Sequence, residues 1–523
     1  MTTVADRPPA QAEGPLFDLR PNIPDISTMS FWAKLGVMKR CLGWVRPYKF
    51  FLFLMLLLTF IEQGLSLIDP FMTQIIIDDV LVQGDRDLLH IVFGVMVGLF
   101  LVRTFYGFIA HYISFYMTTR INFDMRIKFF KHLEDLSLRF YEQNALAEVA
   151  HTENNNLSEI QQFIVTSLND LAGHLIGLAS GVVLIFTIHA ELAAYSIVTL
   201  PIWVFATNWF TGKLGPMQQE MNEQFVQIKN VFFQFVLGIP LVKACNQGQF
   251  ERKRYFGQIT QRSFMNLRFM VWQHLFNVVV GSITVLSTAF VLWYGGMQVI
   301  EGDLSVGQLI AFNMFLGKLL QPIAALLQYW QAFNPICVGA LRVFAIWDLP
   351  YEIQDRPNAV SLKNLKGYIE FSNVSFAYEA NQPVLRNVSF EVMPGQMIAF
   401  CGPSGSGKST IAKLVTRYYD PIGGAIFIDG FDLRDLKYHD YLDQVGIVSQ
   451  RAFMFQDTIA NNILYGRPGA TSDEVVRAAK LARAHDFIMK LPQQYDTVIA
   501  AQDGGLSGGQ VPRLSIARII LRD

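Results

Sequence analysis

Residues 402–410 have the residue types and spacing of a loop that binds phosphate. The segment reads Gly402-Pro403-Ser404-Gly405-Ser406-Gly407-Lys408-Ser409-Thr410, and it lies between the apolar run 397–401 and a helical pattern that begins near Ile411. Glycines let backbone N–H groups approach phosphate oxygens closely, and the N-terminus of the following helix adds partial positive charge. A lysine placed like Lys408 reaches the β- and γ-phosphates, and the hydroxyl of Ser409 can bind Mg²⁺. The sequence therefore predicts a strand at 397–401, a phosphate-binding loop and a helix.

Three further features lie in the same part of the chain. The run Leu506-Ser507-Gly508-Gly509-Gln510 precedes a helical pattern over 514–521, Tyr378 follows the strand pattern 368–376, and Gln450 ends a short strand that includes Val448. Each signal is weak alone, because a Gly-rich turn, a packed aromatic ring or a capping amide would look the same. These three features indicate a function only in combination with the phosphate loop in the same part of the chain.

The elements that must position these residues form a soluble α/β domain. Around 350–357 the apolar runs shorten and glycine and aspartate become frequent, and residues 368–376 alternate as a half-buried strand does. We therefore expect a linker over 350–364 and a nucleotide-binding domain over 365–523.

The composition of the whole chain is that of a membrane protein. Charged residues make up 16% of the 523 residues, hydrophobic residues 52%, and 43 residues are Phe; ordinary soluble proteins have roughly 25% charged residues. The net charge of −1 provides no basic excess for a phosphate backbone, so nucleic-acid binding is disfavoured. Four scattered cysteines favour reduced thiols over a disulfide framework.

Six apolar stretches are long enough to cross a hydrocarbon core of about 30 Å. They centre on residues 50–68, 88–113, 163–188, 192–210, 275–300 and 304–330. The three short connections between them are acidic or nearly uncharged, whereas the two long connections carry many Lys and Arg residues. Because basic residues stay on the cytoplasmic side, both termini and both long connections should be cytoplasmic.

The long connections have the pattern of helices and should project from the membrane. A helix from about Leu88 to about Phe140 would be roughly 75 Å long. The two resulting hairpins should end in turns near 141–147 and 238–245, where other domains can dock. We therefore expect a six-helix transmembrane domain over 50–349 with cytoplasmic extensions.

The start of the chain shows no secretory signal. We expect a disordered tail over 1–30, followed by a basic amphipathic helix over 31–49 that lies at the membrane surface. Four ionisable residues, Glu62, Arg103, His111 and His174, lie at or near membrane depth. A role in lining a pathway is the default reading. Pairing between helices or snorkelling is an equal alternative for Arg103 and His111.

Taken together, these motifs and the six spans resemble an exporter half-transporter of the ATP-binding cassette (ABC) superfamily over about residues 31–523. The resemblance implies an all-α membrane domain of six long helices followed by an α/β P-loop domain. It implies that Tyr378 stacks on adenine, that Lys408, Ser409 and Thr410 hold phosphates and Mg²⁺, and that Gln450 touches Mg²⁺ and the attacking water. Ser507 and Gly509 of the signature Leu506–Gln510 would contact the γ-phosphate of ATP held by a second subunit. Two chains would then complete two sites.

The sequence departs from the family pattern at three places. The given residues end at Asp523, before the apolar strand that normally carries a Mg²⁺-binding Asp and a water-polarising Glu, and before the switch His. We expect the sequence to be incomplete, and the 523-residue chain to hydrolyse ATP near background, since loss of a general base costs about 10²- to 10⁴-fold in rate. Ala500 and Ala501 replace the usual Gly and Glu, which predicts weaker coupling. Val511 and Pro512 replace a polar pair, which predicts a later or strained helix start.

These features predict an ATP-driven exporter, or flippase, for apolar or amphipathic compounds such as lipids, drugs or peptides. It would act as a homodimer or heterodimer in the lipid bilayer of a bacterial cytoplasmic membrane, with ATP and Mg²⁺ as cofactors. The alternative is a truncated or degenerate subunit of a heterodimer that binds nucleotide without hydrolysing it. The sequence does not identify the substrate.

Overall fold

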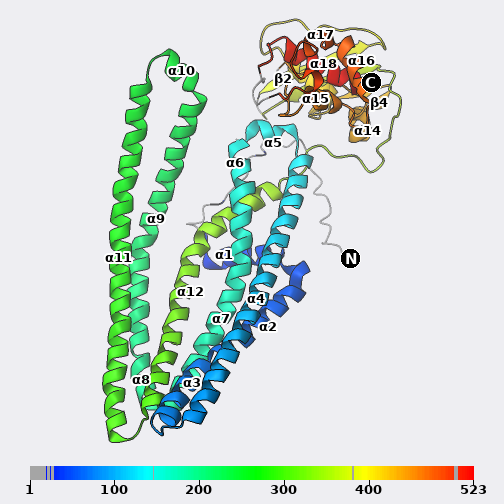
Figure 1. The fold of residues 1–523 in the computed structure, drawn as a ribbon. Helices are drawn as coiled ribbons and strands as arrows, with labels where there is room; N and C mark the ends of the chain where they lie inside the picture. The colour runs from blue at the N-terminus through cyan, green and yellow to red at the C-terminus, as the bar shows by residue number, and fades with distance from the viewer. Residues whose placement is uncertain are drawn as a thin grey trace. The chain divides into compact units, whose positions relative to one another are not determined.

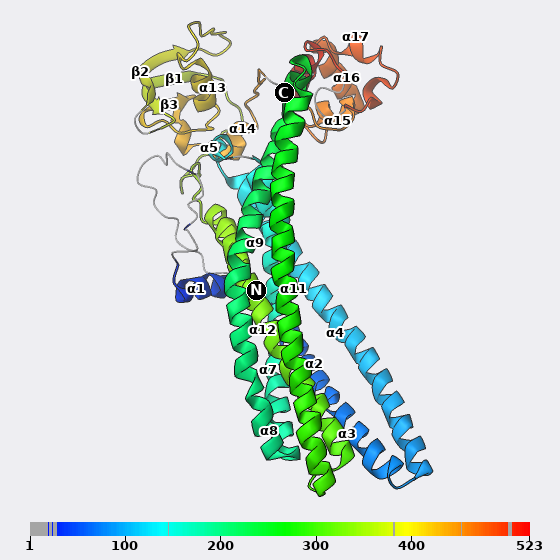
Figure 2. The same cartoon turned by 90° about the vertical axis from the view of Figure 1, so that its left-hand side faces the viewer.

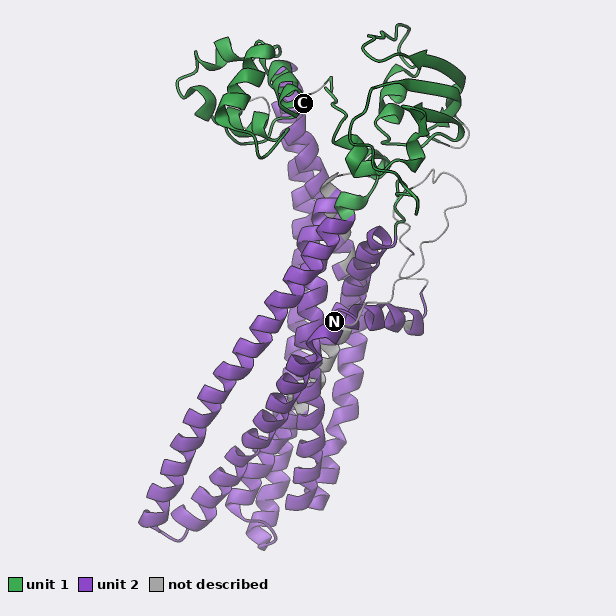
Figure 3. Cartoon of the chain, turned by 90° about the vertical axis from the view of Figure 1, so that its right-hand side faces the viewer, with its two compact units in different colours: residues 1–20, 133–146, 349–523 green, residues 21–132, 147–348 purple. Residues whose placement is uncertain are grey.

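The chain divides into two compact units. The computed structural model describes residues 19, 24, 29–144, 146–379, 382–450, 452–499 and 505–522. Unit 1 contains residues 1–20, 133–146 and 349–523, and unit 2 contains residues 21–132 and 147–348 (Figure 3). Nearly all of the expected tail 1–30, together with Ala500, Ala501 and Asp523, lies outside the described residues.

Unit 2 is built from long helices that run lengthwise beside one another (Figures 1 and 2). α12 packs along α7, and α11 packs along α9. The helices are α1 (Phe31–Leu42), α2 (Lys49–Ser66), α3 (Ile68–Ile75), α4 (Arg86–Asp135), α6 (Leu146–His151), α7 (Leu157–Ile188), α8 (Ala190–Ile197), α9 (Thr199–Leu237), α10 (Ile239–Ala244), α11 (Gly248–Glu301) and α12 (Val306–Trp347), of which α4 ends and α6 begins in unit 1.

The expected membrane spans fall within these helices. Five described helical segments are long and apolar enough to cross a membrane: Arg46–Leu81, Arg86–Asp135, Glu148–Ile188, Ala190–Leu237 and Gly248–Glu301. The sixth expected span, 304–330, lies in α12, whose described side chains form the apolar stretches Val306–Leu319 and Ala332–Trp347. Exposed Phe, Leu, Ile and Val side chains along these helices suit contact with lipid.

The first hairpin extension ends earlier than expected, and the second ends at the expected turn. α4 has 50 residues and is therefore about 75 Å long. It stops at Asp135 instead of continuing to Phe140, because Ser137 adopts an extended backbone and starts the separate helix α5 (Leu138–Gln143). In the second hairpin the short helix α10 occupies the expected turn.

One of the ionisable residues at membrane depth is paired. Arg103 on α4 donates through Nη1 to Asp69 Oδ2 on α3 at 2.6 Å. This ion pair supports the structural reading of Arg103, because it neutralises a guanidinium that would be costly to leave alone in hydrocarbon. The ring of His174 lies 6.4 Å from that of Tyr329, measured between centroids.

A second charged group at this depth compensates for a proline. Pro70 has no N–H, so it cannot give the carbonyl of Ser66 the hydrogen bond that a residue four positions later gives in a helix. Lys318 on α12 donates to this carbonyl and, at 3.2 Å, to the Ser66 hydroxyl. The break between α2 and α3 is therefore closed by a side chain from a helix distant in sequence.

Unit 1 contains a small antiparallel sheet with the order β2-β1-β3-β4. The strands are β1 (Ile369–Ala377), β2 (Pro383–Val392), β3 (Gly423–Ile428) and β4 (Phe431–Asp432). Phe371 pairs with Phe390 of β2 and with Ile426 of β3. One face of the sheet packs against α13 (Lys408–Val415), whose Ile411 and Leu414 join the core.

A second core in unit 1 is helical. It is formed by α15 (Ile459–Leu464), α16 (Ser472–Leu481), α17 (His485–Ile488) and α18 (Gln510–Arg522). A capping box in which Thr471 and Glu474 bond each other's backbone N–H begins α16. The short helix α14 (Tyr438–Leu442) belongs instead to the sheet core, through Tyr441.

Two expected strands do not form. Residues 397–401 and 446–450 lie outside every strand of the described chain. Met397 is 97% exposed and Val448 is 46% exposed. No described strand pairs with either segment, and an extended segment without a paired neighbour gains no ladder of backbone hydrogen bonds. The apolar character of both segments was predicted correctly, but a strand also needs a neighbouring strand to pair with, and the local sequence does not specify one.

We predict that Lys318→Met destabilises the helix bundle. Leaving the Ser66 carbonyl without a donor should lower the free energy of unfolding by about 1–3 kcal/mol, which would appear as a lower midpoint of thermal unfolding in detergent. The same substitution should cost less in a Pro70→Ala background, since alanine restores the missing N–H. Equal losses in both backgrounds would contradict this account of the helix break.

Candidate nucleotide-binding site

The phosphate loop is shaped by two glycines in left-handed conformations. Gly405 has φ 86° and Gly407 has φ 89°. Gly407 is also the N-cap of α13, and a Cβ there would lie 2.6 Å from Leu385 Cδ2. A larger residue at 407 would therefore be strained and would strike β2. The sheet and α13 together fix the curvature of the loop.

Lys408 folds back over this loop. Its ammonium Nζ donates to the carbonyl oxygens of Gly402 at 2.9 Å and Pro403 at 2.8 Å, and it lies 3.3 Å from Ser406 Oγ. The first N–H groups of α13 have no acceptor within the helix, as at every helix N-terminus. An ammonium and several N–H groups thus converge where the sequence predicted phosphate binding, and this arrangement suits an anion.

Tyr378 lies next to the first turn of α13. Its hydroxyl is 3.2 Å from Thr410 Oγ1, and its ring meets those of Phe376 and Tyr419 edge-on. Lys413 Nζ lies 5.2 Å from the centre of the Tyr378 ring, a cation–π distance. The structure therefore brings together Tyr378 and Thr410, two of the residues singled out from the sequence.

The signature segment forms the start of α18 on the helical core. Ser507, Gly508 and Gly509 are exposed. The Ser507 N–H donates to Gln510 Oε1 at 2.8 Å, while the Gln510 N–H donates to the Ser507 carbonyl at 2.9 Å. Leu506 packs at the edge of the helical core. The backbone of residues 507–509 is thus open to solvent.

The expected delay of this helix by Pro512 is wrong. α18 begins at Gln510, before the position 514 that the sequence pattern indicated. Pro512 falls in the first turn, where an N–H has no acceptor within the helix, so the missing donor costs nothing there.

The predicted Mg²⁺ ligands are oxygen donors, which suit this cation. Ser409 is exposed on the first turn of α13, and Gln450 is exposed after residues 446–449. In the part of the chain that the structure describes, no group of three His, Cys, Asp or Glu residues could hold a metal ion. In general Mg²⁺ is bound by one or two protein ligands together with substrate phosphates and water.

The contribution of α5 to this site was not predicted from the sequence. Arg139 donates to Glu352 at 3.0 Å and through Nη1 to the carbonyl of Tyr378 at 2.6 Å. Glu142 accepts from Lys413 Nζ and from the Tyr419 hydroxyl, each at 2.6 Å. The turn near 141–147 was expected to dock against another domain, but no local pattern could name its partners.

The contacts of Glu142 change the ionisation of its neighbours. Burial alone would lower the pKa of Lys413, but its hydrogen bond to Glu142 and the proximity of Tyr378 outweigh burial, and the pKa is raised. Burial, and then the hydrogen bond to Glu142, raise the pKa of Tyr419. Lys413 is therefore a stable cation beside Tyr378 across the physiological pH range.

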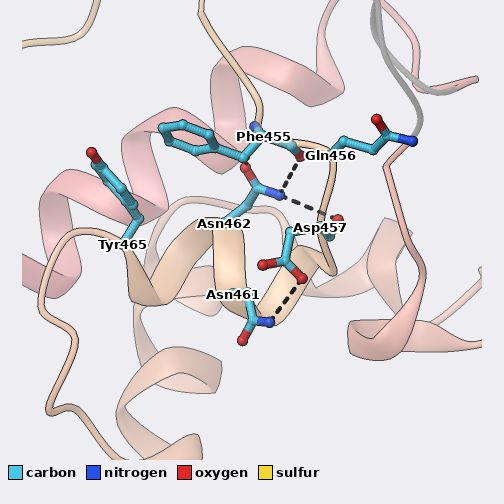
Figure 4. A pocket seen from close by; sticks show the side chains of 6 residues that line it. All are labelled: Phe455, Gln456, Asp457, Asn461, Asn462 and Tyr465. Carbon is cyan, nitrogen blue, oxygen red and sulfur yellow. Dashed lines mark hydrogen bonds between the residues drawn. The ribbon is translucent and has the colours of Figure 1, made fainter. Parts of the chain in front are cut away.

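A pocket of about 380 Å³ lies elsewhere in unit 1, on the helical core. Its walls are Phe455, Gln456, Asp457, Asn461, Asn462 and Tyr465 (Figure 4). The Asn462 side chain accepts from the Phe455 N–H at 2.8 Å and donates to the Phe455 carbonyl at 2.9 Å. None of the predicted nucleotide-binding residues lines this pocket.

Most of the chain is similar to known proteins. Residues 52–323 match the ABC transporter transmembrane region, and residues 385–523 match the ABC transporter family. "Putative multidrug export ATP-binding/permease protein YgaD" of Bacillus subtilis is 32% identical over 501 residues, which span 94% of this chain and 86% of the relative. A similarly named protein of Staphylococcus aureus (strain NCTC 8325 / PS 47) is 32% identical over 93% of this chain and 86% of its own length.

A solved structure agrees with these sequence matches. The structure of a bacterial Atm1-family ABC exporter with ATP bound superposes with a TM-score of 0.76 at 28% identity, over 92% of this chain and 84% of that one. With matching transmembrane and ATP-binding regions on one polypeptide, this chain belongs to the ABC transporter family as an exporter half-transporter, a class of ATPase-coupled transporters.

Proposed function

We propose that the chain binds MgATP at residues 402–410 and works in a dimer that exports apolar or amphipathic compounds, such as lipids, drugs or peptides, from a bacterial cytoplasm. The observation that carries the proposal is the loop itself. It wraps around Lys408 and leads directly into the N-terminus of α13, beside Tyr378. Such a site binds an anion attached to a flat ring.

Each residue of the proposed site has a separate task. The Lys408 ammonium would exchange its bonds to the loop carbonyls for bonds to phosphate oxygens. Tyr378 would face the adenine, with Thr410 and Lys413 fixing its ring. Ser409 and Gln450 would ligate Mg²⁺, which balances phosphate charge when bound, and Gln450 would also orient the attacking water.

The exposed signature explains why the proposal requires two chains. Ser507 and Gly509 directly precede α18, which packs in the helical core, while Lys408 is the first residue of α13, which packs against the sheet. In the proposed dimer the signature of one chain would contact the γ-phosphate of nucleotide bound to the other. Either an identical or a related half-transporter could supply the second chain.

The nature of the substrate is inferred from the membrane helices and the relatives. Unit 2 exposes many Phe, Leu, Ile and Val side chains, with Met at several positions, and such surfaces accommodate varied apolar molecules. The names of the relatives refer to multidrug export. We therefore extend an apolar or amphipathic substrate class to this chain.

The proposed organisation places residues 31–49 at the membrane surface and 50–349 across it, with 365–523 in the cytoplasm after a linker over 350–364. Trp32 on α1 is 76% exposed, while Cys41 is fully buried, as expected for an interfacial helix whose aromatic side chains meet lipid headgroups. Arg40 joins α1 to the end of α12 through Asp348.

We predict that Lys408→Ala weakens ATP binding about tenfold or more, because it removes charge-assisted hydrogen bonds worth roughly 1.5–3 kcal/mol. Equilibrium binding of a fluorescent ATP analogue to the detergent-solubilised chain provides the measurement. Lys437→Ala, which removes an exposed lysine of the same unit, is the matched control. Unchanged affinity in Lys408→Ala would refute the site.

The topology makes a second prediction, tested by thiol labelling. In a Cys245→Ser, Cys401→Ser background, Gln83→Cys and Asp303→Cys should react with a membrane-impermeant maleimide added to intact cells. These positions adjoin Gly84 and Gly302, whose φ angles of 74° and 90° disfavour substitution at the glycines themselves.

The native chain supplies the opposite control. Cys245 and Cys401 are exposed and lie in proposed cytoplasmic parts, so they should react only after the cells are opened. Labelling of Cys245 in intact cells would contradict the proposed orientation.

A further inference from the structure

Arg139 makes a buried ion pair at the nucleotide-binding side of unit 1. Its side chain is 3% exposed and that of Glu352 is 8% exposed. Arg139 Nε lies 3.1 Å from Glu352 Oε1, and the Ser137 hydroxyl donates to Glu352 Oε2 at 2.9 Å. Ser137 and Arg139, two residues apart, both bond the Glu352 carboxylate and hold it in place. The carboxylate in turn orients the Arg139 guanidinium.

The same guanidinium holds the backbone of Tyr378. Arg139 Nη1 donates to the Tyr378 carbonyl at 2.6 Å, and Arg139 Cζ lies 5.0 Å from the centre of the Tyr419 ring, against which Tyr378 packs. Tyr378 comes directly after β1, where the sheet no longer fixes the chain. Arg139 therefore supplies the hydrogen bond that the strand does not.

A second residue of α5 reaches the ring of Tyr378. Glu142 lies three positions after Arg139, a spacing that puts both side chains on one face of a helix. Its carboxylate holds Lys413, whose ammonium lies over the Tyr378 ring. The backbone of Tyr378 and its ring are thus both linked to α5.

We propose that Arg139 is a positioning residue for nucleotide binding, which orients Tyr378 toward the base through its bond to the Tyr378 carbonyl. The inference rests on the proposed function of residues 402–410, and it adds a residue more than two hundred positions away. The chain enters α5 from α4 and continues into α6 and α7, so the residue that orients the base belongs to a membrane hairpin.

In the proposed site, different residues bind the base and the phosphates. Tyr378 would contact adenine, whereas Lys408 and the loop would contact the triphosphate. Loss of Arg139 should therefore weaken binding of ATP and leave binding of inorganic triphosphate unchanged. General unfolding of the site would weaken the binding of ATP and of triphosphate equally. A loss of affinity for ATP alone is therefore a result that a purely structural role would not produce.

The experiment uses the full chain in detergent with the paired variant Arg139→Met/Glu352→Gln. Changing both residues avoids stranding a buried charge, which by itself destabilises a protein. We expect the dissociation constant for ATP to rise about fivefold or more, the lower end of the usual range for coupled sites, with no change for triphosphate. The exposed pair Arg356–Asp435, changed to Arg356→Met/Asp435→Asn, is the matched control and should alter neither constant.

A double-mutant cycle tests the route through Tyr378. In a Tyr378→Ala background the paired variant should cause no further loss of ATP affinity, because there is no ring left to orient. Equal losses for ATP and triphosphate, or additive losses in the cycle, would overturn the role of Arg139. Lys408→Ala should weaken the binding of both ATP and triphosphate. Unchanged affinities in Lys408→Ala would count against the phosphate loop alone, and this result would be distinguishable from failure of the Arg139 proposal.

Discussion

A hydrocarbon layer offers the backbone no hydrogen-bond partner, and this constraint governs the architecture of the membrane-spanning unit. Each N–H and C=O at membrane depth must be satisfied within the protein, which favours long uninterrupted helices. Pro70 breaks this rule at the Ser66 carbonyl, and Lys318 restores the bond from α12. The charge on Lys318 thus has a local structural explanation, as does the pairing of Arg103 with Asp69.

Unit 1 obeys a different constraint, because the proposed phosphate loop must expose N–H groups without collapsing. Packing provides this rigidity: Gly407 lies against Leu385 of β2, and Ile411 and Leu414 anchor α13 to the sheet. The loop can then leave donors unpaired because its two flanking elements are held by the core. The described strands are all antiparallel, and α13 packs in one core with side chains of β1, β2 and β3.

Features that depend on residues close together in the sequence were predicted correctly, whereas features that depend on residues distant in the sequence were not. The six apolar stretches and the Lys408 loop were predictable because each depends on residues close together in the chain. The expected strand at 397–401 was wrong, since a strand also requires a neighbour that its own residues do not specify. The bonds from Arg139 to Glu352 and Tyr378 join residues separated by 213 and 239 positions, and no periodicity in the sequence indicates them.

The chemistry of the α5 contact is informative because apolar packing would have been simpler. Burying two charges requires removing water from both, and a buried ion pair is often no more stabilising than well-packed hydrophobic residues of similar size. An apolar contact, however, tolerates rotation and sliding, whereas a guanidinium shared between a carboxylate and a carbonyl fixes both direction and distance. Arg139 and Glu352 therefore suit an interface whose orientation matters more than its strength. Glu142 and Lys413 follow the same principle at a more exposed position, where water screens their attraction and the geometry of the bond is its main contribution.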